Sequence, residues 1–227
     1  MLADRHYMRG SQYESRWSMT AILLVTNVAA FVVQGILGFF SSFPVIDFFA
    51  LSLRGLAHGF IWQLITFQLM HAGWIHLLVN CWAIYVFGRG VEMVTGKRRF
   101  LAIYFSSGIA GGLLQVLFAW VWPDRFGGAV VGASAGALGL VGAFAAIEPE
   151  RKLMMLVYFV FPLKIRAKTF LLFCFLLSVL GLLFPNSFLG GGIAHAAHLG
   201  GILTGFVSTL RMLKAPTRNF QITAVNT

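Results

Sequence analysis

Residues 130–144 read VVGASAGALGLVGAF, and residues 194–206 read AHAAHLGGILTGF. Both stretches are apolar and rich in small residues, which is typical of helices packed within a membrane. Each nevertheless carries one chemically active side chain, Ser134 in the first stretch and His198 in the second. Because polar and ionisable groups inside a membrane are costly, the two residues indicate a functional site. The simplest interpretation is a hydroxyl nucleophile with an imidazole base.

The composition indicates an integral membrane protein. Of the 227 residues, 59% are hydrophobic and only 11% are charged, whereas soluble domains carry about 25% charged residues. The length predicts one domain. The net charge of +10 does not indicate nucleic-acid binding, because the basic residues lie between apolar runs and not on one soluble face. Cys81 and Cys174 lie in apolar runs and predict neither a disulfide nor a zinc site.

Six apolar segments predict an all-α polytopic membrane protein, a bundle of six transmembrane helices. The fourth and fifth segments are short for a hydrocarbon core of about 30 Å, and local thinning or enclosure by other helices accommodates such spans. Residues 43–70 predict a long loop with short interfacial helices, and residues 153–163 predict an interfacial segment. The six segments cover approximately residues 19–40, 71–87, 100–121, 132–147, 169–184 and 194–210.

The basic residues predict the orientation of the helices. Arg54 and Arg125 lie in segments on one side of the membrane, and the other fifteen Lys and Arg residues lie in segments on the opposite side. This distribution places both termini in the cytoplasm. It predicts a cytoplasmic tail at 1–18, a membrane domain at 19–212 and a second cytoplasmic tail at 213–227. Residues 1–18 lack the apolar core of a cleaved signal peptide, and a prokaryotic plasma membrane is the expected location.

Three polar residues are expected at a similar depth in the membrane. His76, Ser134 and His198 stand 13, 17 and 13 residues before the basic residues that follow their spans. At about 1.5 Å per residue, these spacings correspond to roughly 20, 25 and 20 Å. All three side chains therefore fall within about 10 Å of the outer surface of the hydrocarbon core.

Glycine residues predict that the helices of Ser134 and His198 pack closely. Gly201 and Gly205 have the spacing of small residues at close helix crossings. His198 precedes them by three and seven residues, so it shares their face of the helix. Taken alone, the glycines fit simple packing equally well, and the two active side chains favour a catalytic pair. The helix of Ser134 carries its own set, Gly132, Gly136, Gly139 and Gly142.

Other polar residues accompany this pair. His76 and Asn80 lie four residues apart and share a helix face; both can donate hydrogen bonds to an oxygen that becomes negatively charged during acyl transfer. Taken alone, the two fit structural contacts between helices better. His71 would point about 140° away from His76 in a continuous helix, so we predict an anchoring role in the loop. His195 is one turn before His198 and fits either role.

The histidines are also the candidates for a metal site. Such a site would combine His71, His76, His195 and His198. None of the six predicted spans contains Asp or Glu, and no thiol joins the histidines. We therefore expect neither a metal nor another cofactor.

Three motifs together resemble those of the rhomboid family of intramembrane serine proteases. They are HAGWIHLLVN at 71–80, GASAG at 132–136 and AHLGGILTG at 197–205. The resemblance extends over roughly residues 19–212, in the six-span form. Softer matches are Phe87, Gly88, Glu92 and Gly96.

The resemblance implies a serine endopeptidase without an acidic third member. Ser134 would be the nucleophile, and His198 would be the general base and then the general acid. His76, Asn80 and the backbone N–H of Ser134 would form the oxyanion hole. Transmembrane protein substrates and membrane lipid are the implied partners, and the oligomeric state stays open. A mobile loop at about 185–194 would cap the site. Supporting residues would be Gly132, Ala135, Gly201, Gly205 and His71.

Three positions depart from the family pattern. Ala135 stands where many members have glycine, Leu138 where many have an aromatic residue, and Trp62-Gln63 where a Trp-Arg pair is common. The departures keep a second hypothesis open, a catalytically weak or inactive relative that binds membrane helices. A third hypothesis, a metal or small-solute transporter that uses the histidines, is disfavoured by the lack of carboxylates in the predicted spans.

Overall fold

A computed structural model describes residues 17–157, 161–184 and 192–214. The long helices are α1 (Met19–Phe40), α5 (Trp74–Thr95), α6 (Lys97–Val121), α8 (Ser134–Ile147), α9 (Ala167–Leu183) and α10 (His195–Lys214). The shorter elements are α2 (Val45–Phe49), α3 (Leu53–Ala57), α4 (Gln63–Thr66), the 3-10 helix η2 (Phe67–Leu69), α7 (Pro123–Phe126), and the strands β1 (Lys152–Val157) and β2 (Phe161–Arg166).

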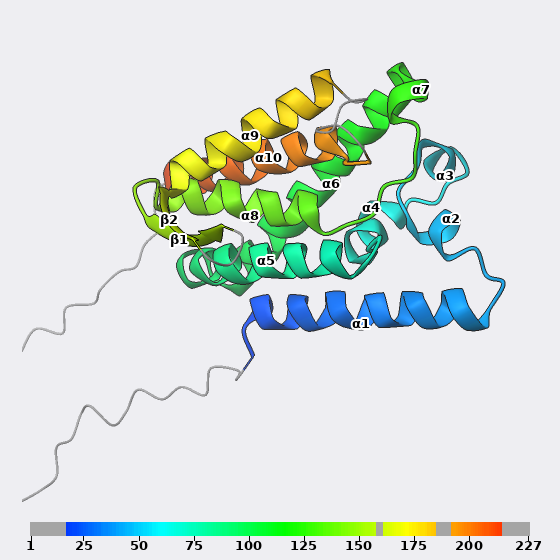
Figure 1. The fold of residues 1–227 in the computed structure, drawn as a ribbon, viewed down its shortest axis with the longest axis horizontal. Helices are drawn as coiled ribbons and strands as arrows, with labels where there is room; N and C mark the ends of the chain where they lie inside the picture. The colour runs from blue at the N-terminus through cyan, green and yellow to red at the C-terminus, as the bar shows by residue number, and fades with distance from the viewer. Residues whose placement is uncertain (1–16, 158–160, 185–191, 215–227) are drawn as a thin grey trace, which may run out of the picture.

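Helix α8 lies inside the bundle and packs against α5, α6, α9 and α10 (Figure 1). From Ala135 to Ala145, every residue except Leu138 is buried. Small side chains let the neighbouring helices approach from several directions. A helix of 14 residues is sufficient here because protein surrounds it, which is one of the two accommodations that the sequence predicted.

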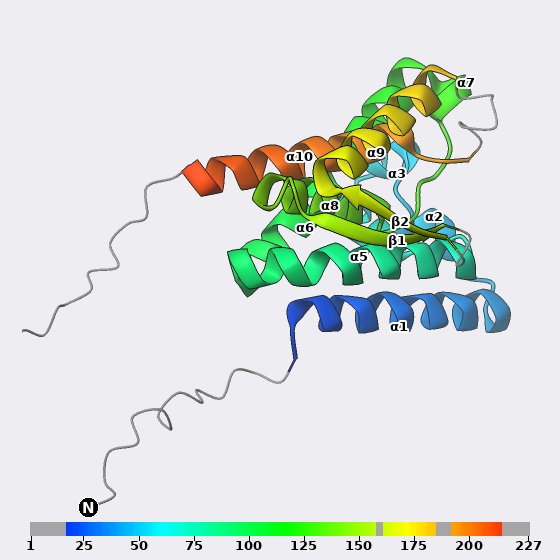
Figure 2. The ribbon, with the colours of Figure 1, turned by 60° about the vertical axis from the view of Figure 1, so that its left-hand side comes forward.

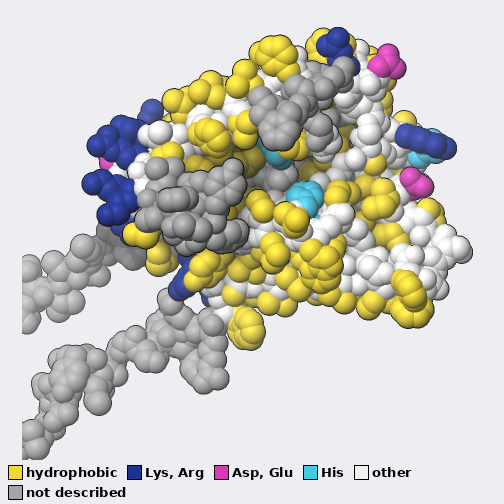
Figure 3. Space-filling view, in the orientation of Figure 1, with side chains coloured by type: hydrophobic (Ala, Val, Ile, Leu, Met, Phe, Trp, Pro, Cys, Tyr) yellow, Lys and Arg dark blue, Asp and Glu magenta, His cyan; other side chains and the backbone are white. Residues whose placement is uncertain are grey.

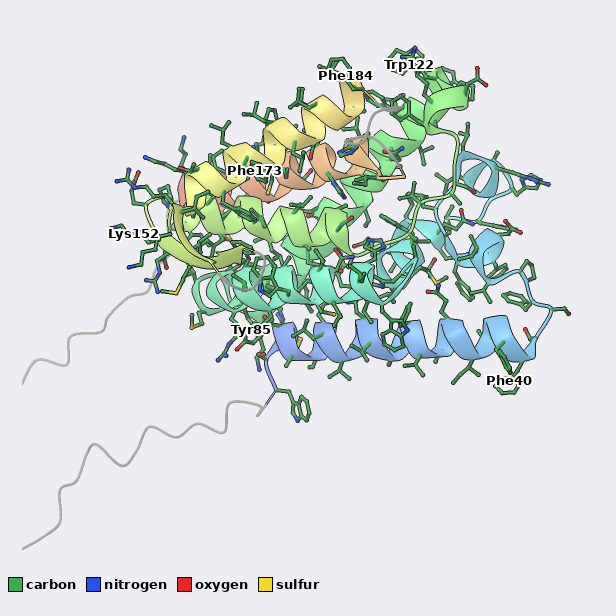
Figure 4. All side chains as sticks on the ribbon, in the orientation of Figure 1. Phe40, Tyr85, Trp122, Lys152, Phe173 and Phe184 are labelled. Carbon is green, nitrogen blue, oxygen red and sulfur yellow. The ribbon has the colours of Figure 1, made fainter. Side chains whose placement is uncertain are left out.

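The long helices coincide with the six predicted spans. Within the described residues, α1, α5 and α6 have the length and apolar composition of membrane-crossing helices, and α8 and α9 are shorter apolar helices. Large apolar side chains are exposed on the outside of the bundle, among them Phe40, Phe173 and Phe184 (Figure 4). Such a surface is unfavourable in water and suits contact with lipid. The chain is therefore a polytopic all-α membrane protein.

Helix α5 continues beyond the predicted span and includes Glu92 near its end. Glu92 is buried and accepts hydrogen bonds from the backbone N–H groups of Met19 and Thr20, at 2.7 and 2.9 Å. It also accepts one from the Thr20 hydroxyl, at 2.7 Å. These donors belong to the first turn of α1, where negative charge is favourable. Glu92 therefore holds the start of α1 against the end of α5.

Strands β1 and β2 form an antiparallel hairpin in which Lys152 pairs with Arg166. The prediction for residues 153–163 missed it, because the uniformly apolar sequence shows no alternation of polar and apolar residues. Beside the hairpin, Glu150 forms ion pairs with Arg166 and Lys168. The hydrogen bond from Lys168 holds the pKa of Glu150 below its ordinary value.

The segment from residue 43 to 70 contains the short helices α2, α3, α4 and η2, as predicted. Gln63 lies buried at its centre. Its Nε2 donates to the Asp47 carbonyl at 2.9 Å, and its Oε1 accepts from the Ser52 N–H at 3.2 Å. A Cβ at Gly55 would overlap the Gln63 carboxamide. Gln63 thus connects three parts of the loop.

The two ends of the bundle differ in charge. The start of α1 and the end of α10 lie at the same end (Figures 1 and 2). Lys and Arg side chains gather there in Figure 3, and Lys152 lies there in Figure 4. The arrangement agrees with an even number of membrane crossings, because both described chain ends lie on the basic side.

Candidate active site

The structure brings Ser134 and His198 into contact. Ser134 is the first residue of α8, and His198 lies in the first turn of α10. The Nε2 atom of His198 lies 2.9 Å from the Oγ atom of Ser134, a hydrogen-bonding distance. A hydroxyl that donates to imidazole is arranged as a nucleophile that can lose its proton to a base. The predicted approach of the two helices is confirmed.

Glycine makes this approach possible. A Cβ at Gly201 would overlap the backbone carbonyl of Ala135, and a Cβ at Gly205 would overlap that of Gly139. The backbones of α8 and α10 therefore touch directly, and no larger residue fits at either position without a shift. The small-residue contact predicted between these helices sets the distance between the hydroxyl and the imidazole.

Ser134 and His198 open into a cavity of about 640 Å³. Its walls come from α5, α6, α7, α9, α10 and the loop before α8. Figure 3 looks onto this face, and histidine side chains are visible in the hollow near its centre. The cavity is partly open to the outside. It is lined in part by His76, Val79, Asn80, Gln115, Arg125 and Ile193.

Two candidate hydrogen-bond donors line the cavity from α5. The Nδ2 atom of Asn80 is buried and meets no acceptor within the described part of the chain. The His76 ring lies so close to Gly132 that a Cβ there would stand 2.7 Å from it. Gly132 also has a φ of +130°, a conformation that favours glycine. The first backbone N–H groups of α8, beginning at Ser134, add donors without partners inside the helix.

His71 lies in the loop before α5 and is not helical. It is fully buried, and its ring centroid lies 5.2 Å from that of His76. Gln34 of α1 donates to the His71 carbonyl at 2.8 Å and accepts from its N–H at 3.1 Å. The position agrees with the expected anchoring role, since the backbone of His71 joins the loop to α1.

His195 packs between α9 and α10. It is buried at the start of α10, and its ring centroid lies 5.8 Å from that of His198. A Cβ at Gly181 of α9 would overlap the His195 ring. Of the two roles left open by the sequence, these contacts fit packing beside the site.

Two residues at the site were not singled out from the sequence. Gln115 of α6 is buried, and its Oε1 accepts a hydrogen bond from the N–H of Ala197 at 3.3 Å, directly before His198. A lone amide in an apolar segment was the available signal. Arg125 of α7 also lines the cavity. Its signal was its place among the few basic residues on the predicted outer side.

The departures from the family pattern leave the Ser134–His198 contact intact. The methyl group of Ala135 faces Gly111 of α6, where an added Cβ would stand 2.9 Å from it. A glycine opposite thus leaves room for alanine. Leu138 is half-buried and packs against the core cluster. The proposed lid at 185–194 lies for the most part outside the described residues, as do most of both predicted tails.

Comparison with known proteins identifies the family of the chain. Residues 58–215 match the Rhomboid domain. The chain is 30% identical over 174 residues to the rhomboid-family protein YdcA of Bacillus subtilis, which covers 73% of this chain and 74% of YdcA. It is 27% identical over 164 residues to rhomboid protease AarA of Providencia stuartii, covering 68% and 57% of the two chains. It is 36% identical over 83 residues to inactive RHOMBOID-like protein 8 of Arabidopsis thaliana, covering 37% and 22%.

The fold and the site define an integral membrane protein with a serine and a histidine in contact inside its helical bundle. The chain belongs to the rhomboid family. That family includes serine intramembrane proteases as well as proteins named as inactive. This chain spans 57% of the length of AarA.

Proposed function

We propose that this chain is an intramembrane serine endopeptidase that cleaves transmembrane segments of other proteins. The observation that carries the proposal is the 2.9 Å contact between His198 Nε2 and Ser134 Oγ at an open cavity. Family membership alongside named proteases supports the reaction class. The apolar outer surface of the bundle supports substrates that arrive through the lipid.

In the first half of the reaction, Ser134 Oγ attacks the carbonyl carbon of the scissile peptide bond while His198 Nε2 accepts the hydroxyl proton. The resulting tetrahedral intermediate carries negative charge on the former carbonyl oxygen. His198 then gives the proton to the leaving amine nitrogen, and the carbon–nitrogen bond breaks. Ser134 is left as an acyl ester.

In the second half, water from the cavity replaces the amine. His198 accepts a proton as the water oxygen attacks the ester, and the same proton returns to Ser134 Oγ when the ester bond breaks. The carboxyl product leaves, and both residues regain their starting states. The pair has limited access to water, but hydrolysis of the ester requires a water molecule at the site. The partly open cavity supplies that water.

Donors beside Ser134 stabilise the negative oxygen. We assign this role to the His76 ring, the Nδ2 atom of Asn80 and the N–H of Ser134. The buried, unpartnered Nδ2 of Asn80 supports the assignment, because the negative oxygen of the tetrahedral intermediate would supply its acceptor. Gly132 supports it through its close approach to His76. His71, Ala135, Gly201 and Gly205 hold these groups in position.

The membrane domain extends over residues 19–212, with tails at 1–18 and 213–227 on the cytoplasmic side. The concentration of Lys and Arg side chains at one end of the bundle supports this orientation (Figure 3). The active cavity then opens toward the outer side of a prokaryotic plasma membrane.

A fluorophosphonate probe tests the nucleophile directly. Full-length protein in detergent should be labelled, and Ser134→Ala should abolish labelling. Ser178→Ala is a matched control, since Ser178 is a buried serine of α9 that bonds to the Cys174 carbonyl. Labelling that persists in Ser134→Ala would refute the assignment of the nucleophile.

A cleavage assay tests the activity. Reconstituted protein is incubated with a single-span membrane protein whose helix contains small residues. We expect products with the wild type and loss of activity of about 10⁴-fold or more in Ser134→Ala and His198→Ala. Unchanged cleavage in His198→Ala would overturn the assignment of the base.

The alternative function is a catalytically weak or inactive protein that binds membrane helices. The departures at Ala135 and Leu138, together with an inactive relative, favour it. Retention of the single-span protein by wild type, without any product that depends on Ser134, would support this alternative over proteolysis.

A further inference from the structure

A second cavity lies at the far end of α5 from His76. Its volume is about 930 Å³, and it lies between the start of α1 and the turn that connects α5 to α6. Its lining includes Trp17, Arg89, Glu92, Met93, Arg98 and Arg99. Most of the length of α5 therefore separates this cavity from the Ser134 site. An α-helix rises by about 1.5 Å for each residue along its axis.

The lining of this cavity is strongly basic. Arg89, Arg98 and Arg99 have exposed side chains, and within the described residues none of the three forms an ion pair. Arg89 lies over the ring of Tyr85, with its guanidinium carbon 5.9 Å from the ring centroid. Lys97 adds a fourth basic side chain. The local excess of positive charge is suited to an anion.

The acidic residue in the lining does not cancel this charge for a ligand. Glu92 is buried, and its two oxygens already accept three hydrogen bonds from Met19 and Thr20. Because these donors occupy its oxygens, Glu92 forms no ion pair with the three arginines within the described residues. The arginines are consequently available to a phosphate group, which guanidinium groups bind through paired hydrogen bonds.

Large apolar side chains lie beside the arginines. Trp17 is 60% exposed and Met93 is 81% exposed, and both line the cavity. Tryptophan is common where a membrane meets water. A basic pocket next to an apolar rim, at the end of membrane-crossing helices, has the two chemistries of a phospholipid: a phosphate and the beginning of its acyl chains.

We propose that this cavity binds the headgroup of an anionic phospholipid. Arg89, Arg98 and Arg99 surround the phosphate, while Trp17 and Met93 contact the glycerol and the upper acyl chains. A free phosphate ion would engage the arginines but would make no use of the apolar rim, so a lipid is the better occupant. The site is independent of the proposed proteolysis.

Native mass spectrometry of the full chain in a neutral detergent tests the proposal. Phosphatidylglycerol and phosphatidylcholine are titrated separately, and the bound fraction is measured. The test variant is Arg89→Gln/Arg98→Gln/Arg99→Gln. The matched control is Lys152→Gln/Lys164→Gln/Lys214→Gln, which removes three exposed basic residues outside the cavity. Thermal unfolding in the same detergent establishes that each variant is folded, and Arg98→Lys/Arg99→Lys serves if the triple variant is not.

We expect wild type to prefer phosphatidylglycerol. The arginine variant should bind it about tenfold more weakly or worse, while the lysine control stays within about twofold. The Arg98→Lys/Arg99→Lys variant should lie between wild type and the triple variant, since lysine keeps the charge without the paired geometry. Equal losses in the two triple variants would reduce the effect to general surface charge and overturn the site.

A competition arm distinguishes lipid from a free anion. Inorganic phosphate at millimolar concentration should leave phosphatidylglycerol bound, and Trp17→Ala should weaken binding of the lipid. If inorganic phosphate displaces the lipid and Trp17→Ala has no effect, the cavity is a site for free anions and the lipid proposal is wrong. None of these readouts depends on Ser134, so failure here leaves the proposed proteolysis untouched.

Discussion

Gly205 of α10 lies against the backbone carbonyl of Gly139 in α8, at a distance that leaves no room for a Cβ atom. This contact occurs on the same two helices that carry Ser134 and His198, which are 64 positions apart in the chain. The separation between hydroxyl and imidazole therefore depends on a contact between two backbones several residues away.

Replacing this glycine tests that dependence. Gly205→Ala should lower the free energy of unfolding by about 1–3 kcal/mol, since overpacking forces the helices apart. Cleavage should fall by about 10²-fold, the effect of a displacement of about 1 Å between reacting groups. Gly35→Ala is the control, because a Cβ at Gly35 meets nothing within 4 Å. Full activity in Gly205→Ala would contradict the argument.

Asn80 tests the stabilisation of the negative oxygen. Asn80→Ala should lower kcat by about 10²–10³-fold with little change in KM, since the hydrogen bond forms in the transition state. The measurement is steady-state cleavage of a single-span substrate in proteoliposomes. Leu78→Ala, which alters an exposed side chain of the same helix, should retain activity. A loss confined to KM would show that Asn80 serves binding instead.

Ala135 tests whether a departure from the family pattern matters. Ala135→Gly should retain labelling by fluorophosphonate at a rate within about threefold of wild type, because Gly111 already makes room for the methyl group. The variant should lose about 1 kcal/mol of stability, the usual cost of glycine inside a helix. A rate increase of tenfold or more would mean that the methyl group limits the reaction.

Glu92 tests the attachment of α1. Glu92→Gln removes the charge that receives hydrogen bonds from Met19 and Thr20 and should lower the free energy of unfolding by about 1.5–3 kcal/mol. Hydrogen exchange at the start of α1 should accelerate. Glu148→Gln is the control, since Glu148 is a half-exposed acid paired with Arg151. Equal effects of the two variants would remove the special role of Glu92.

The helical framework could be predicted from the sequence because lipid imposes a simple requirement. Long apolar segments must be helical to satisfy their backbone groups, and the basic residues between them mark the ends. Helix α5 continues to Thr95, past the predicted end of its span, because Arg89 and Glu92 mark the end of an apolar segment without ending the helix. The β1–β2 hairpin could not be foreseen, since its apolar residues do not alternate with polar ones.

The site could be predicted in part for a related reason. Ser134 and His198 stand out because polar groups are rare in apolar segments, and their depth follows from the helical rise. Gln115 had the same signal, yet its role depends on a contact with Ala197, 82 positions away. Such pairings depend on how the helices are rotated about their axes, and hydrophobicity alone does not specify that rotation.

Helix α1 lies before the region that matches the Rhomboid domain, which begins at residue 58. It is nevertheless tied at both ends: Glu92 receives the N–H groups of its first turn, and Gln34 exchanges two hydrogen bonds with the backbone of His71. A fragment starting at residue 58 would leave the buried Glu92 carboxylate and the backbone of His71 without these partners. The start of the matched domain therefore does not mark the start of the structural unit, because α1 is bonded both to α5 and to the loop before it.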